Sequence, residues 1–273
     1  MHKQTLQEAW DASTHVLADS LLVKDWPKDL PWHAVTQQQL KNETHLLPVV
    51  LQLDELDGEQ RKQMQTLLVM KNQEAVAPAM LLSSDYGADA LARQLAPHVM
   101  AMLPDESRVL LRFADPQVFM HLLWILPLEE LASICEATGQ WSVPFMGEWH
   151  EMQFNRRPEA SWTALDEQRS VALFNAPLIN RILAARSHDG PDAYWRDAKD
   201  ANEWLRVAQS RFELVNADDC VAFAQHALRF GGKFAAHQTI ASYLTEARSQ
   251  PGAYASRTGV MSTRDWNSVV AIS

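Results

Sequence analysis

The first half of the chain alternates short apolar runs with segments of helical periodicity. The apolar runs have the length of buried strands and are flanked by polar residues. They occupy residues 45–53, 76–82 and 109–113. Residues 57–72 and 88–103 instead place apolar side chains three and four positions apart, which predicts two amphipathic helices. Pro97 lies inside the second helix and predicts a break near Ala96, because proline donates no backbone hydrogen bond.

Asp115 and Pro116 mark the start of a helix directly after the third apolar run. An aspartate side chain accepts hydrogen bonds from the first helical turn, and proline suits the first helical position. This helix is apolar on nearly every side, which is typical of a buried helix, and Pro127 ends it. Residues 141–154 alternate aromatic and polar side chains around Gly147 and so predict a hairpin.

The second half of the chain has the spacing of helices. Apolar stripes of helical period occupy residues 164–186, 192–215, 221–230 and 234–248, and Pro177 predicts that the first is two short helices or one kinked helix. Asp218-Asp219 are expected to cap the third helix, and Gly231-Gly232 to end it. The tail at 249–273 is rich in Ser, Gly and Thr, which predicts irregular structure from which Trp266 docks onto the helices.

These patterns predict an α+β or α/β fold with two lobes. Residues 1–156 are expected to form a mixed sheet covered by helices, because strands alternate with helices there. Residues 157–273 are expected to form an all-helical C-terminal lobe. The boundary lies in Asn155–Pro158, a basic stretch that contains a proline. A chain of 273 residues is long enough for one or two domains with their own cores.

Charge is distributed unevenly between the two predicted lobes. The chain has 24 Lys and Arg against 34 Asp and Glu, a formal net charge of −10. Residues 1–156 carry all of this excess, since residues 157–273 contain equal numbers of acidic and basic side chains. The balance argues against non-specific nucleic-acid binding, which needs clustered Lys and Arg. The acidic lobe is interpreted either as an aid to solubility or as a face that attracts a basic partner.

Segments that direct a chain into or across a membrane are not evident. The N-terminus carries charges where a secretory signal needs an unbroken apolar core. The apolar stretch Val118–Leu126 is far shorter than the roughly 20 residues that span a bilayer. We therefore expect a cytoplasmic protein with no membrane insertion. Cys135 and Cys220 lie far apart without CxxC spacing, which argues against a disulfide scaffold and against a thiolate metal site.

Candidate chemistry along the chain is sparse. The sequence contains no GxSxG, GxGxxG or HExxH motif. Arg112 and Asp115 form the most suggestive polar pair, but the cap position of Asp115 explains them as a structural ion pair. We therefore predict no catalytic, cofactor-binding or metal-binding residue. One alternative is an uncharacterised α/β enzyme with a site near Arg112 and Asp115, together with Glu129.

Tryptophan is abundant, with ten in the chain. Large aromatic side chains dominate binding hot spots because they bury much area at a small cost in entropy. We therefore predict a partner-binding role for aromatic residues that lie around the junction between the lobes. These residues are Trp141, Phe145, Trp149 and Trp195. The simpler alternative is that they pack the lobes together.

The stretch from Ala77 to Phe154 has a recognisable order of motifs. An apolar strand precedes LLSSDYGADALARQL, and RVLLRF, ADPQVF and LLWILPLEEL follow. This order of motifs is similar to that of one protein family. Its features are a strand that ends in Arg-Phe, a helix that begins with Asp-Pro, and a break at Leu126–Pro127 before a second helix. The chain thus resembles the bacterial type VI secretion effector adaptor/chaperone family over most of residues 45–248. The residues that carry the motif are Arg112, Phe113, Asp115 and Pro116.

The resemblance implies a cytoplasmic adaptor that is not an enzyme and needs no cofactor. Members of the family hold a specific toxic effector, usually by its N-terminal region, and help to load it onto the spike protein VgrG. The expected partners are thus a cognate effector and VgrG, and the four motif residues are expected to be structural. A general protein-interaction scaffold is a further alternative, which gene neighbourhood would separate from an adaptor.

Overall fold

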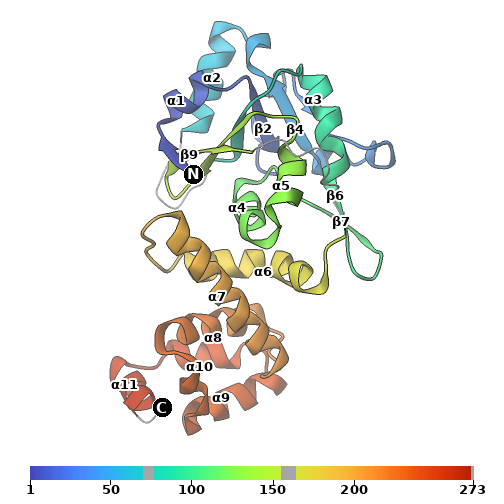
Figure 1. The fold of residues 1–273 in the computed structure, drawn as a ribbon. Coiled ribbons are helices and arrows are strands. Elements are labelled where there is room, and N and C mark those ends of the chain that lie inside the picture. Colours follow the sequence, from blue (N-terminus) through green and yellow to red (C-terminus); the bar gives the residue numbers. More distant parts are fainter. Residues whose placement is uncertain (70–76, 155–163, 272–273) are drawn as a thin grey trace. The chain divides into compact units, whose positions relative to one another are not determined.

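The computed structural model describes residues 1–69, 77–154 and 164–271, and the chain divides into two compact units. The first unit is Met1–Leu173 and the second is Phe174–Ser273. The boundary predicted between residues 156 and 157 lies outside the described residues. The predicted fold class is confirmed, because the first unit holds a sheet covered by helices and the second is helical (Figure 1).

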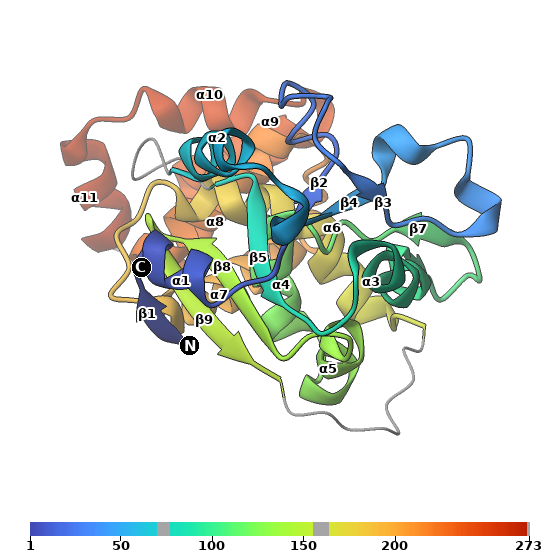
Figure 2. The same ribbon diagram turned by 90° about the horizontal axis from the view of Figure 1, so that it is seen from above.

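A seven-stranded sheet forms the centre of the first unit, in the order β1-β9-β8-β5-β2-β4-β3 (Figure 2). Each pair of neighbouring strands in it runs antiparallel. The strands are β1 His2–Gln4, β2 His15–Asp19, β3 His33–Ala34, β4 Pro48–Gln52, β5 Ala79–Ser83, β8 Gln140–Phe145 and β9 Glu148–Gln153. Strand β2 pairs with β4 on one side and β5 on the other, and all of its residues are buried.

Helices cover both faces of this sheet. They are α1 Leu6–Asp11, α2 Gly58–Leu68, α3 Ala88–Leu95, α4 Pro116–Ile125 and α5 Leu128–Cys135. On one face, Ala18, Leu81 and Trp149 pack in a core with side chains of α1 and α2. On the opposite face, Trp141 stacks on Phe119 of α4, with ring centroids 4.7 Å apart. Burial on both faces explains why the strands are nearly continuous apolar runs in the sequence.

The segment after α3 differs from the prediction. A helix was expected over 88–103, but a 3-10 turn that contains Pro97 ends it, and Met100–Met102 then form strand β6. The predicted break near Ala96 is therefore confirmed, whereas the helical continuation beyond it is wrong. Strand β6 pairs with β7, Arg108–Leu110, in a separate two-stranded sheet. The third apolar run thus supplies a strand outside the main sheet.

The local signals around α4 and the hairpin are confirmed. Asp115 caps α4 through its side chain, and Pro116 is the first residue of the helix. Strands β8 and β9 form the predicted hairpin, and the turn residues Met146 and Gly147 have φ angles of 52° and 78°. Two successive positive φ angles are typical of a two-residue turn whose twist matches that of the flanking strands.

The second unit is helical. It begins at Phe174, within α6 Glu167–Leu183, and includes the helices that follow. The others are α7 Pro191–Ser210, α8 Ala217–Phe230, α9 Gln238–Ser249, α10 Ala253–Gly259 and α11 Thr263–Ala271. The cap of α8 is Asn216, which accepts hydrogen bonds from the backbone N–H groups of Asp218 and Asp219. The two aspartates therefore lie in the first turn, where the helix dipole favours them, and not at the predicted cap position. Buried Asp219 also accepts from the N–H groups of Gly252 and Ala255, which fixes the start of α10.

The C-terminal segment is helical, so the irregular tail expected over 249–273 is wrong. Its polar residues act as helix signals: Asp265 accepts hydrogen bonds from the backbone and the hydroxyl of Ser262 at the start of α11. Val269 of α11 is buried, which shows that the helix has an apolar face against the rest of the unit. Ser262 is therefore part of the start of a helix and not of a loop.

Trp266 docks onto α8, as predicted, and completes an aromatic cluster. Its ring lies 4.2 Å from that of His226 and 4.9 Å from that of Phe230, measured between centroids. His226 Nδ1 also lies 2.9 Å from the hydroxyl of Tyr254. Burial in this cluster, with a smaller effect of the nearby Arg229, lowers the pKa of His226 to about 4.

We expect the second unit to lose stability as the pH falls from 6.5 toward 4. Between these values the unfolded chain binds a proton at His226 and the folded unit does not, so the unfolded state holds more protons. The free energy of unfolding then decreases by up to about 1.4 kcal/mol per pH unit from this group. Urea denaturation across this range should show a shallower pH dependence for His226→Gln than for the wild type.

The control is His45→Gln, because it removes an exposed histidine of the first unit and leaves the aromatic cluster around His226 intact. An NMR titration of the wild-type His226 ring gives a second, independent measurement. A ring that protonates near pH 6.5 would contradict the assignment.

Candidate functional site

Three charged side chains join the end of β2 to the start of α4. Asp19 is 1% exposed, and its Oδ2 accepts a hydrogen bond from Arg112 Nε at 2.8 Å. Arg112 Nη2 lies 3.3 Å from Asp115 Oδ2. The predicted structural pair of Arg112 and Asp115 is thus present. Asp19 is a third member that the sequence motif does not contain.

Hydrogen bonds from the backbone hold both carboxylates of this cluster in place. Asp19 Oδ1 accepts from the N–H of Leu21, and Asp115 Oδ1 accepts from the N–H of Gln117, each at 2.9 Å. Burial raises the pKa of Asp115, and the charge of Arg112 offsets part of that effect. Buried charges persist in proteins when they are paired and hydrogen-bonded, so each group has a structural explanation.

Three of the four predicted partner-binding residues are buried in the sheet of the first unit. Trp141, Phe145 and Trp149 are 0%, 6% and 2% exposed. Trp149 pairs with Pro144 across the hairpin, so it faces the side of the sheet opposite to Trp141 and Phe145. Trp195 is partly buried in α7 of the second unit. The first unit therefore does not present its three aromatic rings on one surface, and a role of these residues in binding stays a prediction.

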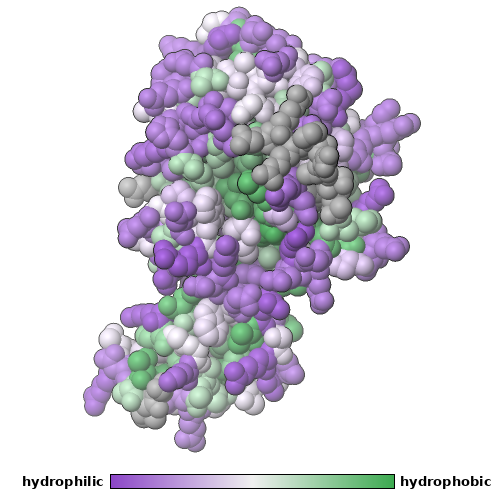
Figure 3. Space-filling model, in the orientation of Figure 1, coloured by the Kyte–Doolittle hydropathy of each residue, from purple (hydrophilic) through white to green (hydrophobic). Residues whose placement is uncertain are grey.

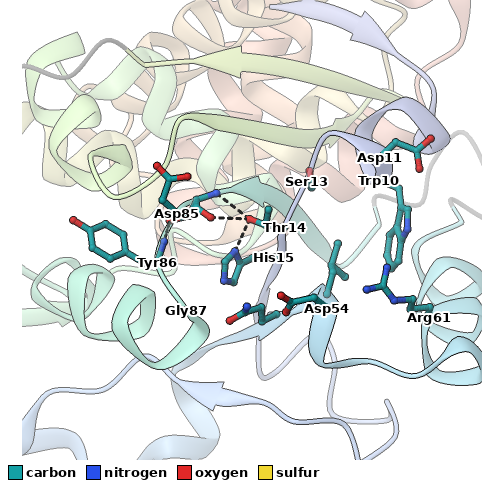
Figure 4. Close-up of a pocket in the computed structure, with 13 residues that line it drawn as sticks. Trp10, Asp11, Ser13, Thr14, His15, Asp54, Arg61, Asp85, Tyr86 and Gly87 are labelled. Carbon is teal, nitrogen blue, oxygen red and sulfur yellow. Dashed lines mark hydrogen bonds between the residues drawn. The ribbon is translucent and has the colours of Figure 1, made fainter.

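A pocket of about 430 Å³ opens at the end of the sheet where β2 begins and β4 and β5 end (Figure 4). This volume lies within the roughly 300–1,000 Å³ of typical ligand pockets. The end of α1, the first turn of α2 and the loop from β5 to α3 contribute to its walls. Residues of these segments include Asp11, Arg61 and Gly87.

Thr14 organises the wall of the pocket at the start of β2. Its Oγ1 accepts a hydrogen bond from the N–H of Ser84 at 2.9 Å and lies 3.1 Å from the carbonyl oxygen of the same residue. It also lies 2.7 Å from His15 Nδ1. When the hydroxyl proton of Thr14 goes to the carbonyl of Ser84, the matching tautomer of His15 carries its proton on Nδ1 and donates it to Thr14.

This assignment leaves His15 Nε2 with a lone pair and no hydrogen-bond partner among the described residues. His15 is 1% exposed. Burial lowers its pKa, and the charge of Asp54 opposes that effect. A lowered pKa favours the neutral ring, and in the tautomer protonated on Nδ1 the Nε2 atom is an acceptor in the wall of the pocket.

Acidic side chains outnumber basic ones around the pocket. Asp11, Asp54 and Asp85 line it together with the single cation Arg61. All three aspartates are exposed. Asp11 accepts a hydrogen bond from the side chain of Gln7, and Arg61 Nε donates one to the carbonyl of Leu56. Both bonds join residues that are close in the sequence. The pocket therefore offers negative charge and hydrogen-bond acceptors.

Metal-binding clusters and membrane-spanning helices can be assessed for the residues that the structure describes. Within 1–69, 77–154 and 164–271, no three His, Cys, Asp or Glu side chains are placed to hold a metal ion. None of the helices in these segments combines the length and the apolar character needed to cross a lipid bilayer.

Sequence reasoning missed the pocket and the third member of the charged cluster. Asp19 and Arg112 are 93 positions apart, and the pocket draws on α1, β2, α2 and the loop after β5. No spacing rule connects such segments. The one available signal was a histidine and an aspartate at the two ends of a strand whose interior is wholly apolar.

Residues 15–133 match the family described as Domain of unknown function (DUF4123). Over this segment the chain is similar to that family. The segment includes His15 and the whole cluster of Asp19, Arg112 and Asp115. Searches of curated proteins and of solved structures gave no match.

Replacing Asp19 should destabilise the first unit. Asp19→Ala leaves Arg112 without its shortest ion pair and the N–H of Leu21 without its acceptor. We expect a loss of about 2 kcal/mol in the free energy of unfolding, less than for a fully buried pair because Arg112 is one-third exposed. Urea denaturation checks this. Asp89→Ala is the control, because its exposed pair with Arg93 is worth only about 0.5 kcal/mol. Equal losses in both variants would refute the structural role.

Burial predicts different effects on stability for Trp149 and Trp195, two of the three tryptophans that were expected to bind a partner. Trp149→Ala should lower the free energy of unfolding by about 3–5 kcal/mol, because the ring is enclosed in the core under α1 and α2. Trp195→Ala should cost less, since Trp195 is only partly buried. Thermal unfolding and partner binding should be measured on both. A Trp149→Ala variant that unfolds normally but binds no partner would instead support direct contact.

Proposed function

We propose that this chain is a non-enzymatic, cytoplasmic adaptor for a type VI secretion effector. It binds the effector, through the N-terminal region of that protein, and promotes its loading onto the VgrG spike. The observation that carries the proposal is the match of residues 15–133 to the DUF4123 family, which is associated with type VI secretion effector adaptors.

The residues of the adaptor motif support this proposal through the structural role they have in the fold. Arg112, Phe113, Asp115 and Pro116 all lie within the matched segment. Phe113 is fully buried, and the two charged residues tie the start of α4 to β2. An adaptor needs a rigid body on which a partner surface is held, and these four residues stabilise such a body.

The charge of the first unit is consistent with a partner that carries basic segments. The excess of acidic residues lies within residues 1–156. Figure 3 shows mostly hydrophilic side chains over α1 and α2 on the face drawn. A field of one sign speeds the encounter with a partner of opposite charge and weakens with salt.

Co-expression with the products of neighbouring genes tests the proposal. The tagged full chain should co-purify with one effector in a complex of fixed stoichiometry, measured by size-exclusion chromatography with light scattering. An effector without its N-terminal region should not bind. If neither VgrG nor any neighbouring gene product binds, the proposal fails.

Two other outcomes would favour the alternatives from the sequence. Saturable turnover of a substrate that Asp115→Asn abolishes, in a folded variant, would favour an enzyme near Arg112. Stable complexes only with proteins whose genes lie far from any spike gene would favour a general interaction scaffold.

A further inference from the structure

We propose that the pocket at the start of β2 binds a cationic side chain, the guanidinium of an arginine or the ammonium of a lysine, from a partner polypeptide. The claim that the pocket binds a cation is argued from its lining residues alone. Only the claim that the cation belongs to an effector rests on the proposed adaptor function.

The charges around the pocket are the first observation. Asp11, Asp54 and Asp85 line the pocket together with one guanidinium, that of Arg61, so with a neutral His15 the lining has a formal charge of −2. The three carboxylates form no salt bridge with any residue in the described part of the chain. Asp11 accepts one hydrogen bond from the neutral amide of Gln7, and all three carboxylates retain oxygens that can accept charge-assisted hydrogen bonds from a bound cation.

His15 is the second, independent observation. Its side chain is buried, and no described residue bonds its Nε2, which accepts when the ring proton lies on Nδ1, the tautomer that a bound cation selects. Figure 4 shows the imidazole bonded to Thr14 and lying on the side of the pocket that Asp54 and Gly87 form. A buried acceptor without a donor costs free energy, and a guanidinium or ammonium would supply the missing N–H.

The start of α3 does not turn the pocket into an anion site. A helix N-terminus attracts anions through its free N–H groups. Here the N–H of Ala88 already donates to the carboxamide oxygen of Gln52 at 2.9 Å. Asp85, two residues before the cap Gly87, adds a negative charge next to the remaining groups. An anionic ligand would therefore meet repulsion where it would seek donors.

The spread of the carboxylates favours an extended cation. Figure 4 shows Asp11, Asp54 and Asp85 on separate sides of the pocket, each from a different segment. A metal ion needs ligands that converge on one point, whereas a guanidinium presents several donors in a planar fork. Trp10 and Tyr86 also line the pocket and offer aromatic surface along which the apolar stem of a lysine or arginine can lie.

An NMR titration of the full chain tests the site directly. The probes are N-acetyl-arginine amide and N-acetyl-lysine amide, with neutral N-acetyl-citrulline amide as the matched control ligand. We expect saturable shifts of the His15 ring nitrogens and of Gly87 with the two cations and none with citrulline. No saturable shift with either cation, or a stronger response to calcium chloride than to both, would overturn the proposal.

Matched variants separate a specific site from general attraction. Asp54→Asn with Asp85→Asn should weaken binding of the arginine probe about tenfold. Asp25→Asn with Asp29→Asn removes the same charge from exposed positions outside the pocket and should change binding less than twofold. Equal weakening by both pairs would show only long-range attraction and would refute the site.

The source of the cation is tested in the complex with an effector. Each lysine and arginine of the bound effector region is changed to glutamine. The affinity of every effector variant is then measured with the wild-type chain and with the Asp54→Asn, Asp85→Asn double variant. One effector position should lose affinity much less in the variant pocket than in the wild type. If all losses simply add, or if spermidine binds more tightly than the arginine probe, the cation does not come from the effector. Probe binding without any effector complex would refute the adaptor function and leave the site intact.

Discussion

Strand β2 sets the constraint on which the first unit depends: it is buried on both faces, yet it begins with a histidine and ends with an aspartate. Each of these two side chains is only 1% exposed, so neither reaches water. Each therefore needs a polar partner inside the protein. Asp19 is paired with Arg112, which brings the start of α4 to the sheet. His15 is paired with Thr14 at one nitrogen only, and the second nitrogen belongs to the pocket wall.

Local sequence patterns predicted the fold well wherever a residue type at its position fits only one kind of secondary structure. The cap at Asp115 and the hairpin over 141–154 followed directly from the sequence. Helical spacing failed beyond Pro97, because the apolar residues after it also suit a strand and proline stops the helical hydrogen bonds. In the C-terminal tail, the content of Ser, Gly and Thr predicted a loop, although Ser262 with Asp265 instead forms the start of a helix.

The candidate site was harder to predict, because it depends on pairing between distant segments. The aromatic hairpin shows the difficulty most clearly. Trp141 and Trp149 were expected to act together, but the two-residue turn pairs Phe145 with Glu148. Across such a turn, positions of equal parity point to opposite faces of the sheet, so the two rings belong to different cores. Composition pointed to the aromatic residues, whereas only the register decides which of them can share a surface.

The edge strand β1 has a consequence for how the unit is made. Its residues pair with β9, with His2 opposite Glu151, so the two ends of the unit meet in one sheet. Contacts this remote in sequence carry a large loop-closure entropy and are typical of slow folding. On the ribosome, the first strand emerges long before its partner exists. During synthesis the sheet therefore stays incomplete until the hairpin of β8 and β9 has been made and β1 can pair with β9.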